Sequence, residues 1–180
     1  MSTDATQRAA ILEIAREAVA AAVAGHALRA VALDNPPPAS GVFVTLKKEG
    51  DLRGCIGTLE CRAALAVEIA RVAVNAARED PRFPPVTEAE LPFLEFEVSV
   101  LGPLERIDPA DPNAIVIGRH GLVVADALRR GLLLPQVAPE WGWDREEFLA
   151  HTCRKAGMAS DAWRRGVDVY RFEAEVFGDE

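Results

Sequence analysis

Segments of alternating apolar and polar residues, joined by short turns, constrain the fold of this chain more than any other feature. Apolar side chains recur at every second position in 41–48, as they do in 94–100 and 169–177. This is the period of a β-strand with one buried face. The Glu-Gly-Asp sequence at 49–51 is typical of a hairpin turn, which makes 52–56 the returning strand. Strands that return through hairpins pair antiparallel, so we expect a mostly antiparallel sheet.

Helical periodicity occupies the segments between these strands. Residues 4–24 and 63–78 each carry an apolar stripe at helical spacing. Asp144, with Glu147 three residues later, predicts the start of a third helix over 145–156. Further short strands are predicted at 114–118, 122–125 and 130–134. The predicted fold class is therefore α+β, a mostly antiparallel sheet flanked by helices, rather than a doubly wound parallel sheet.

Length and composition bound the function. The 180 residues fit a single domain over 1–180, or one domain with a small second lobe. The formal net charge of −8 argues against nucleic-acid binding, which needs clustered basic residues. No apolar run approaches the ~18 residues of a transmembrane helix. The three cysteines do not form a disulfide framework, and a targeting signal is not apparent, so we expect a reducing, cytoplasmic setting without a membrane.

The sequence Leu-Arg-Gly-Cys-Ile-Gly-Thr at 52–58 places Cys55 between Gly54 and Gly57, two residues after Arg53. Glycine permits positive φ and close approach of a ligand, so we predict a tight loop that presents the thiol. A nearby guanidinium would lower the thiol pKa. The alternative is a bulge at a strand end with Cys55 as a small core residue, because free cysteine is usually buried.

Two further residues are candidates for chemistry. His120, in a glycine-bounded turn, is the best candidate for a catalytic base; alternatively, it caps a hairpin through a hydrogen bond. Arg82, held between Pro81 and Phe83, is suited to bind a carboxylate or phosphate. Its alternative role is to bond loop carbonyl groups.

Glu97 and Gln136 complete the predicted site. Glu97 lies on the polar face of a predicted strand, and Gln136 follows a proline. Each lines a cleft or simply faces water. The cysteine and histidine spacings match no familiar zinc site, so we predict no metal and no cofactor.

The segment 52–58 resembles the signature of the AMMECR-one domain family. Other landmarks of that family follow in order over residues 11 to 177. They are Asp80-Pro81-Arg82-Phe83-Pro84-Pro85, Glu90-Leu91, Glu97-Val98-Ser99-Val100-Leu101, His120-Gly121-Leu122, Leu133-Leu134-Pro135-Gln136-Val137-Ala138, Trp143-Asp144, Phe148-Leu149 and Cys153-Arg154-Lys155-Ala156-Gly157. The length and the C-terminal pattern are most similar to the prokaryotic branch, AmmeMemoRadiSam system protein A. The resemblance implies two unequal lobes and a genomic link to a Memo-like protein and a radical SAM enzyme, but no known reaction.

These observations predict an accessory or binding protein that acts with the Memo-like protein and the radical SAM enzyme. Its pocket would lie at the Leu52–Thr58 loop and would bind a peptide or a small acidic ligand. The residues predicted to bind are Arg53, Gly54, Gly57, Arg82, Glu97 and Gln136. The alternative is an enzyme with Cys55 as nucleophile or group carrier, assisted by His120, in a cleft between the lobes.

Overall fold

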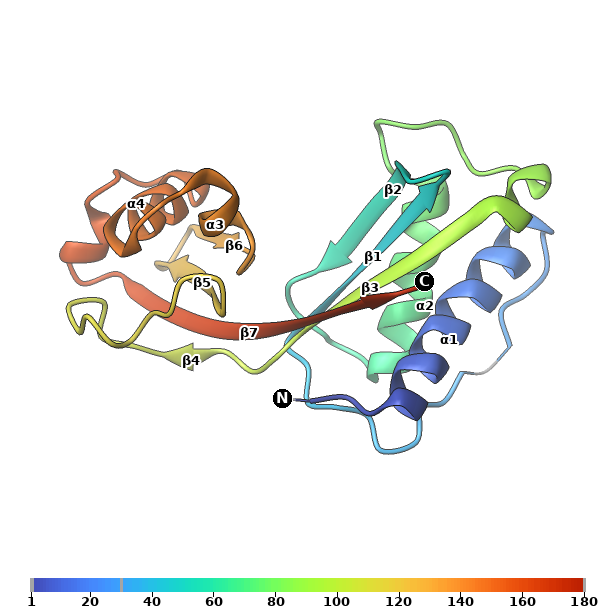
Figure 1. Ribbon diagram of the computed structural model, residues 1–180, viewed down its shortest axis with the longest axis horizontal. Coiled ribbons are helices and arrows are strands. Elements are labelled where there is room, and N and C mark those ends of the chain that lie inside the picture. The colour runs from blue at the N-terminus through green and yellow to red at the C-terminus, as the bar shows by residue number, and fades with distance from the viewer. Residues whose placement is uncertain (1, 30, 180) are drawn as a thin grey trace. The chain divides into compact units, whose positions relative to one another are not determined.

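The computed structural model describes residues 2–29 and 31–179 and confirms the α+β fold class (Figure 1). The chain divides into two compact units. The larger unit comprises residues 1–101 and 175–180, and the smaller unit comprises residues 102–174. The proline-rich segment 36–38 lies inside the larger unit and does not mark the boundary between the two units. The cleft between two lobes stays a prediction.

The larger unit is a sheet covered by two helices. Its sheet has the strand order β2-β1-β3-β7, and β1 pairs antiparallel with both β2 and β3. The helices α1 and α2 contact β1 to β3. The elements are α1 (Ala5–Val23), β1 (Gly41–Lys48), β2 (Asp51–Thr58), α2 (Leu65–Arg78), the 3-10 helix η1 (Glu88–Phe93), β3 (Leu94–Leu101) and the last residues of β7 (Asp168–Gly178).

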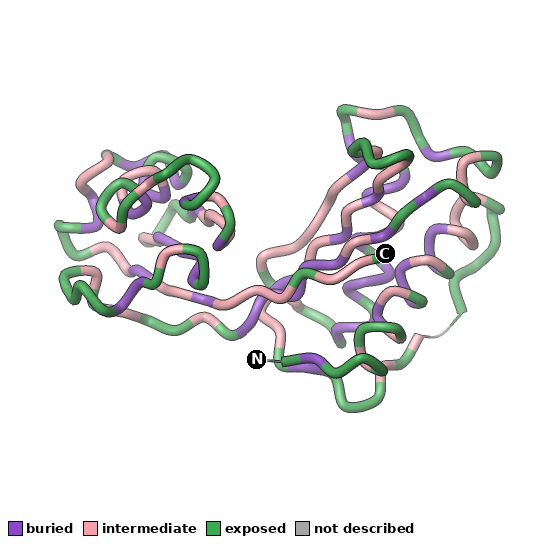
Figure 2. Tube along the Cα trace, viewed as in Figure 1, coloured by how far each residue is buried: buried purple, intermediate pink, exposed green. Residues whose placement is uncertain are grey.

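The two faces of this sheet differ in chemistry, as the alternating pattern predicts. On one face Val42, Val44 and Leu46 are fully buried in the cluster that also contains the apolar residues of α1 and α2. Figure 2 colours these buried positions purple. On the other face, Thr45 and Lys47 are only partly buried. Polar side chains of β1, β2 and β3 therefore share a face that the helices leave uncovered.

The segment around Cys55 is a strand, which confirms the returning strand predicted at 52–56, whereas the tight glycine loop predicted there is wrong. Residues 51–58 pair with β1 except at Arg53, which is the extra residue of a bulge opposite Leu46 and Lys47. Neither Gly54 nor Gly57 has a positive φ. The chain needs glycine there because of space, not because of a turn.

Close packing explains both glycines. A Cβ on Gly54 would lie 2.1 Å from the carbonyl oxygen of Ala76, so α2 packs directly on the backbone of β2. A Cβ on Gly57 would lie 2.3 Å from the ring of Phe43 on the opposite face. Gly54 is thus needed for the packing of α2 on β2, and its ligand contact stays a prediction.

The smaller unit combines short strands and helices. β5 pairs antiparallel with β6 and β7, and β4 also pairs with β7. The helix α4 (Arg145–Lys155) packs on β5 in a second apolar cluster, which contains Phe148, Leu149, Cys153, Leu122 and Val124. The elements are β4 (Glu105–Arg106), β5 (His120–Ala125), β6 (Arg130–Leu133), α3 (Val137–Trp141), α4 (Arg145–Lys155), the 3-10 helix η2 (Ala162–Arg164) and the first residues of β7.

The strand predicted at 114–118 is wrong. The backbone there forms a turn in which the carbonyl of Val116 accepts hydrogen bonds from the N–H groups of Arg119 and His120. Gly118 has a φ of 86°, which a strand does not contain. The apolar residues Ala114 and Ile115 are buried all the same, so burial rather than strand pairing explains the pattern.

The helix start predicted at Asp144 is confirmed, and η1 begins with the same kind of cap. Asp144 and Glu147 form a reciprocal capping box at α4, and Thr87 forms one with Glu90 at η1. Among the described residues, no helix is both long and apolar enough to cross a membrane.

Candidate functional site

Cys55 lies on β2, on the face of the sheet away from the helices. Its register partner on β1 is Thr45, whose own partner on β3 is Glu97, so the three side chains form a row across the strands. The hydroxyl of Thr45 donates a hydrogen bond to Sγ of Cys55 at 3.2 Å. Cys55 is partly buried and does not belong to the apolar core cluster, so the alternative that it is a core residue is wrong.

The backbone of Cys55 is held by two charged side chains from the loop after α2. Its N–H donates to Oδ2 of Asp80 at 2.9 Å, and its carbonyl accepts a 3.5 Å contact from Nη2 of Arg82. These two groups take the place that a neighbouring strand would occupy at this edge of the sheet. The loop is thereby fixed to the strand at the cysteine.

Asp80 and Arg82 form a two-armed ion pair. Nε and Nη2 of Arg82 donate to the two carboxylate oxygens at 3.0 and 2.7 Å. Asp80 is buried, and the hydrogen bonds from Arg82 hold the pKa of its carboxyl well below the usual range. The Arg82 side chain is 55% exposed, and its Nη1 group meets no acceptor among the described residues. An oriented guanidinium with free N–H groups therefore lies beside the backbone of Cys55.

Arg53 is paired as well. It lies at the bulge of β2, and its Nε and Nη2 donate to the carboxylate of Glu90 at 2.9 and 3.1 Å. Hydrogen bonds from Arg53, and next from the N–H of Thr87, lower the pKa of Glu90 to about 2. Glu90 therefore balances the charge of Arg53. Its Nη1 is buried and has no partner within the described part of the chain.

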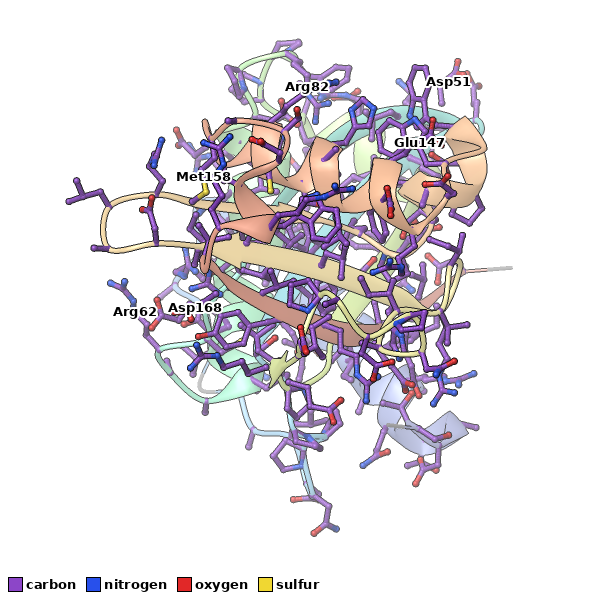
Figure 3. The ribbon with its side chains drawn as sticks, turned by 90° about the vertical axis from the view of Figure 1, so that its left-hand side faces the viewer. Asp51, Arg62, Arg82, Glu147, Met158 and Asp168 are labelled. Atoms are coloured by element: carbon purple, nitrogen blue, oxygen red, sulfur yellow. The ribbon has the colours of Figure 1, made fainter. Side chains whose placement is uncertain are left out.

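An aromatic ring lies beside both arginines. The guanidinium carbons of Arg53 and Arg82 lie 6.0 and 5.6 Å from the centre of the Phe83 ring. Such contacts restrict both side chains to one orientation. Figure 3 labels Arg82 on this loop.

The other predicted residues have different surroundings. Glu97 forms an ion pair with Lys47 at 2.9 Å on the same face as Cys55. Gln136 belongs to the smaller unit, where it is exposed and precedes α3. Two hollows of the larger unit, of about 250 and 520 Å³, contain none of the predicted site residues. The pocket at 52–58 stays a prediction.

His120 is buried in the smaller unit. Its Nδ1 accepts a hydrogen bond from the N–H of Val116 at 3.0 Å, and its Nε2 lies 4.0 Å from Glu173. Burial, followed by the charges of Arg171 and Arg119, lowers the pKa of the imidazole. In the neutral ring the proton is then on Nε2, and no lone pair is free to accept another. The hydrogen-bonding role matches the predicted alternative, whereas its pairing with Cys55 stays a prediction.

Sequence reasoning missed the residues that organise this site. Thr45, Asp80 and Glu90 contact Cys55, Arg82 and Arg53 by hydrogen bonds, yet none was predicted as a site residue. The signals were present: Asp80 belongs to a family landmark, and Glu90 to a capping box. Among residues 2–29 and 31–179, no group of three or more histidine, cysteine or acidic residues is placed to hold a metal ion.

Comparison with known proteins places the chain in a family. The AMMECR1 family model matches residues 12–177. The chain belongs to the AMMECR1 family. A protein of Methanothermobacter thermautotrophicus is 51% identical over 145 residues, which are 78% of this chain and 76% of that protein. A protein of Thermofilum pendens is 44% identical over 96% of this chain and 90% of its own length.

A solved structure shares the fold of this AMMECR1 domain. The crystal structure of an uncharacterized protein from Pyrococcus horikoshii matches with a TM-score of 0.78 and 42% identity. The match covers 94% of this chain and 90% of that one. The α+β fold is therefore shared with an archaeal relative.

Proposed function

We propose that this AMMECR1 domain is a binding or accessory protein that acts with a Memo-like protein and a radical SAM enzyme. Its binding surface is the Cys55 surface, by which we mean Thr45, Cys55, Asp80, Arg82 and Phe83. An acidic group of a partner or small ligand binds Arg82 there. The observation that carries the proposal is the oriented, half-exposed guanidinium of Arg82 beside the Cys55 backbone.

The pairing of charges supports binding over catalysis. Asp80 occupies two arms of Arg82 and holds them in place, while Nη1 has no acceptor among the described residues. A pre-oriented guanidinium binds a carboxylate with little loss of side-chain entropy. Among the described residues of the larger unit, no side chain that contacts Cys55 is a general base for its thiol. In the neutral His120 ring, one nitrogen accepts a hydrogen bond and the other carries the proton.

Binding to purified partners tests this function. The Memo-like protein and the radical SAM enzyme of the same genome are titrated with the wild type, Arg82→Ala and Arg82→Lys. A charge-assisted hydrogen bond contributes about 1.5–3 kcal/mol, so Arg82→Ala should weaken binding at least about tenfold. Arg82→Lys should weaken it less, because the charge remains.

Two control variants separate the role of Arg82 from the general loss of an arginine and from an effect on folding. Arg62→Ala removes an arginine (labelled in Figure 3) whose side chain is 82% exposed. The side chain of its partner, Glu60, is 61% exposed. This variant should bind like the wild type. The double variant Asp80→Asn with Arg82→Gln leaves no buried carboxylate unpaired, so its folding is less affected. Equal binding by the wild type and this double variant would exclude the Arg82 role.

The alternative function is a cysteine-dependent enzyme with Cys55 as nucleophile or group carrier. The hydrogen bond from Thr45 to Sγ favours it, because a thiolate accepts such a bond more strongly than a thiol. Iodoacetamide labelling at increasing pH, read for each cysteine by mass spectrometry, separates the two functions. An enzyme requires an apparent pKa of Cys55 well below the usual value of about 8.5.

The other cysteines are references within the same molecule. Burial, followed by the charge of Glu68, raises the pKa of the Cys61 thiol. Burial also raises the pKa of Cys153, which is inaccessible. If Cys55 reacts no earlier in the pH series than Cys61, the enzymatic alternative fails.

A further inference from the structure

An aromatic stack on the smaller unit ends in an exposed tryptophan. The rings of Trp143 and His151 are nearly parallel, with an angle of 5° and 3.7 Å between their centres. Trp141 stacks on Trp143 at 6.1 Å and 17°. Trp141 is nevertheless 71% exposed. The stack holds the indole of Trp141 in place while most of its surface faces solvent.

Arginine side chains cover four other aromatic rings among the described residues, namely Phe83, Phe96, Trp163 and Phe177. Arg164 and Arg145 lie over Trp163, with guanidinium carbons 4.6 and 5.9 Å from the ring centre. Arg16 lies over Phe96 in the same manner. Within the described residues, no guanidinium covers Trp141. The most exposed of the described aromatic side chains thus has no cation on its ring, unlike Trp163 in the same unit.

Acidic residues lie near Trp141 in the sequence, and Arg145, the basic residue among them, contacts Trp163 and the carbonyl of Pro109. Glu140 precedes it on α3, is exposed and forms no ion pair with any described residue. Asp144 caps the start of α4, and Glu147 lies one turn before His151 on that helix (Figure 3). An electron-rich indole face next to carboxylates attracts a cation and repels phosphate groups.

We propose that Trp141 and Glu140 form a docking point for an arginine side chain of a partner protein. The guanidinium stacks on the exposed face of Trp141, and its N–H groups donate to the carboxylate of Glu140. Arginine fits better than lysine because its planar group stacks on a ring and bonds a carboxylate at once. This docking point belongs to the smaller unit and does not depend on the role proposed for Cys55.

The indole N–H signals of the three tryptophans test the proposal residue by residue. The ¹⁵N-labelled protein is titrated with an acetylated, amidated tripeptide of arginine at low salt. The tripeptide of citrulline, which has nearly the same shape without the charge, is the control. The Trp141 signal should shift and saturate with arginine alone, while Trp163, already covered by two arginines, should not move. Equal shifts with citrulline, equal shifts at Trp163, or no shift would overturn the proposal.

Variants separate the two parts of the docking point. Glu140→Gln should weaken the binding of the arginine tripeptide about two- to fivefold, which is the range expected for a surface ion pair. Glu88→Gln, which removes an exposed carboxylate from the larger unit, should leave its affinity unchanged. If both weaken binding equally, the peptide responds only to net charge and the proposal fails.

A variant at Trp141 also tests whether a second copy of the chain covers this face instead. Trp141→Leu keeps an apolar side chain and should abolish the saturable arginine shift, read at Trp143. Light scattering then compares this variant with the wild type. A dimer that Trp141→Leu converts to a monomer would overturn the proposal in favour of self-association.

Discussion

The polar cluster around Cys55 in the larger unit and the one around His120 in the smaller unit differ in what they leave free. At Cys55, buried Asp80 holds an arginine that keeps N–H groups available to solvent. At His120, the N–H of Val116 occupies the imidazole nitrogen that could act as a base. The first cluster orients N–H groups for the ligand that we propose. The second cluster uses the imidazole nitrogen to accept a hydrogen bond from the backbone of a turn. A glycine-bounded cysteine and a glycine-bounded histidine look alike in sequence but serve different ends.

The largest expected effect is at the first cluster. Asp80→Ala leaves the N–H of Cys55 without its acceptor. It also removes the carboxylate that accepts both hydrogen bonds from Arg82. We expect a loss of about 3 kcal/mol in the free energy of unfolding, measured by urea denaturation. Asp168→Asn, at an exposed pair with Arg106, should cost under about 1 kcal/mol. Similar losses in the two variants would mean that the first cluster is not specially ordered.

The loss of stability in Asp80→Ala should depend on pH. Because the pKa of Asp80 is lowered in the folded protein, its stabilisation is present above the ordinary pKa of about 3.9. It fades as the pH falls below that value. The gap between the wild type and Asp80→Ala should therefore be full at pH 7 and narrow towards pH 2.

A second prediction compares the glycines of the two clusters. In Gly54→Ala the new Cβ meets the backbone of Ala76 at 2.1 Å, and a backbone cannot move aside. In Gly121→Ala it meets the ring of Phe172 at 2.3 Å, and a ring can shift. We expect losses of about 3 and 2 kcal/mol respectively, read from thermal unfolding. The reverse order would mean that α2 adjusts more easily than the core of the smaller unit.

A third prediction concerns the ion pair of Arg53. Glu90→Gln leaves a mostly buried guanidinium without its counter-charge, for an expected loss of about 2 kcal/mol. Glu60→Gln, at the exposed pair with Arg62, should change stability by less than about 0.5 kcal/mol. Denaturant titration of both variants measures the contrast. Equal effects would show that burial does not strengthen the Arg53 pair.

The smallest expected effect is at His120. The pKa of this imidazole is lowered in the folded state, so stability is retained above the ordinary pKa near 6.5 and lost as the pH falls through it. Protonation of Nδ1 also breaks the bond from Val116, which contributes about 1 kcal/mol. The groups acting on the ring are Arg171, Arg119, Glu173 and Glu105.

His120→Asn is the matched variant, because an amide oxygen can accept the same N–H without titrating. Stability of both proteins is measured from pH 7.5 to pH 5. The wild type should lose more than His120→Asn over that range. Parallel curves would show that His120 does not titrate there as its surroundings require.

Prediction from sequence succeeded where a local pattern was sufficient. The strand at 41–48 matches β1, and the helix at 145–156 matches α4 to within one residue. It failed at 114–118, where buried apolar residues form a turn, because burial alone does not distinguish a strand from a packed turn. It missed α3, whose five residues are too few to show helical periodicity.

The sequence alone determined the α+β class, the hairpin that carries Cys55 and membership of the AMMECR1 family, since alternation, turns and ordered motifs are local properties. Only the tertiary structure decided which charges meet. Asp80 and Glu90 reach β2 across 25 and 37 residues, and such pairings depend on strand register and loop path. The same holds for Gly54, whose missing side chain matters only because α2 packs on it.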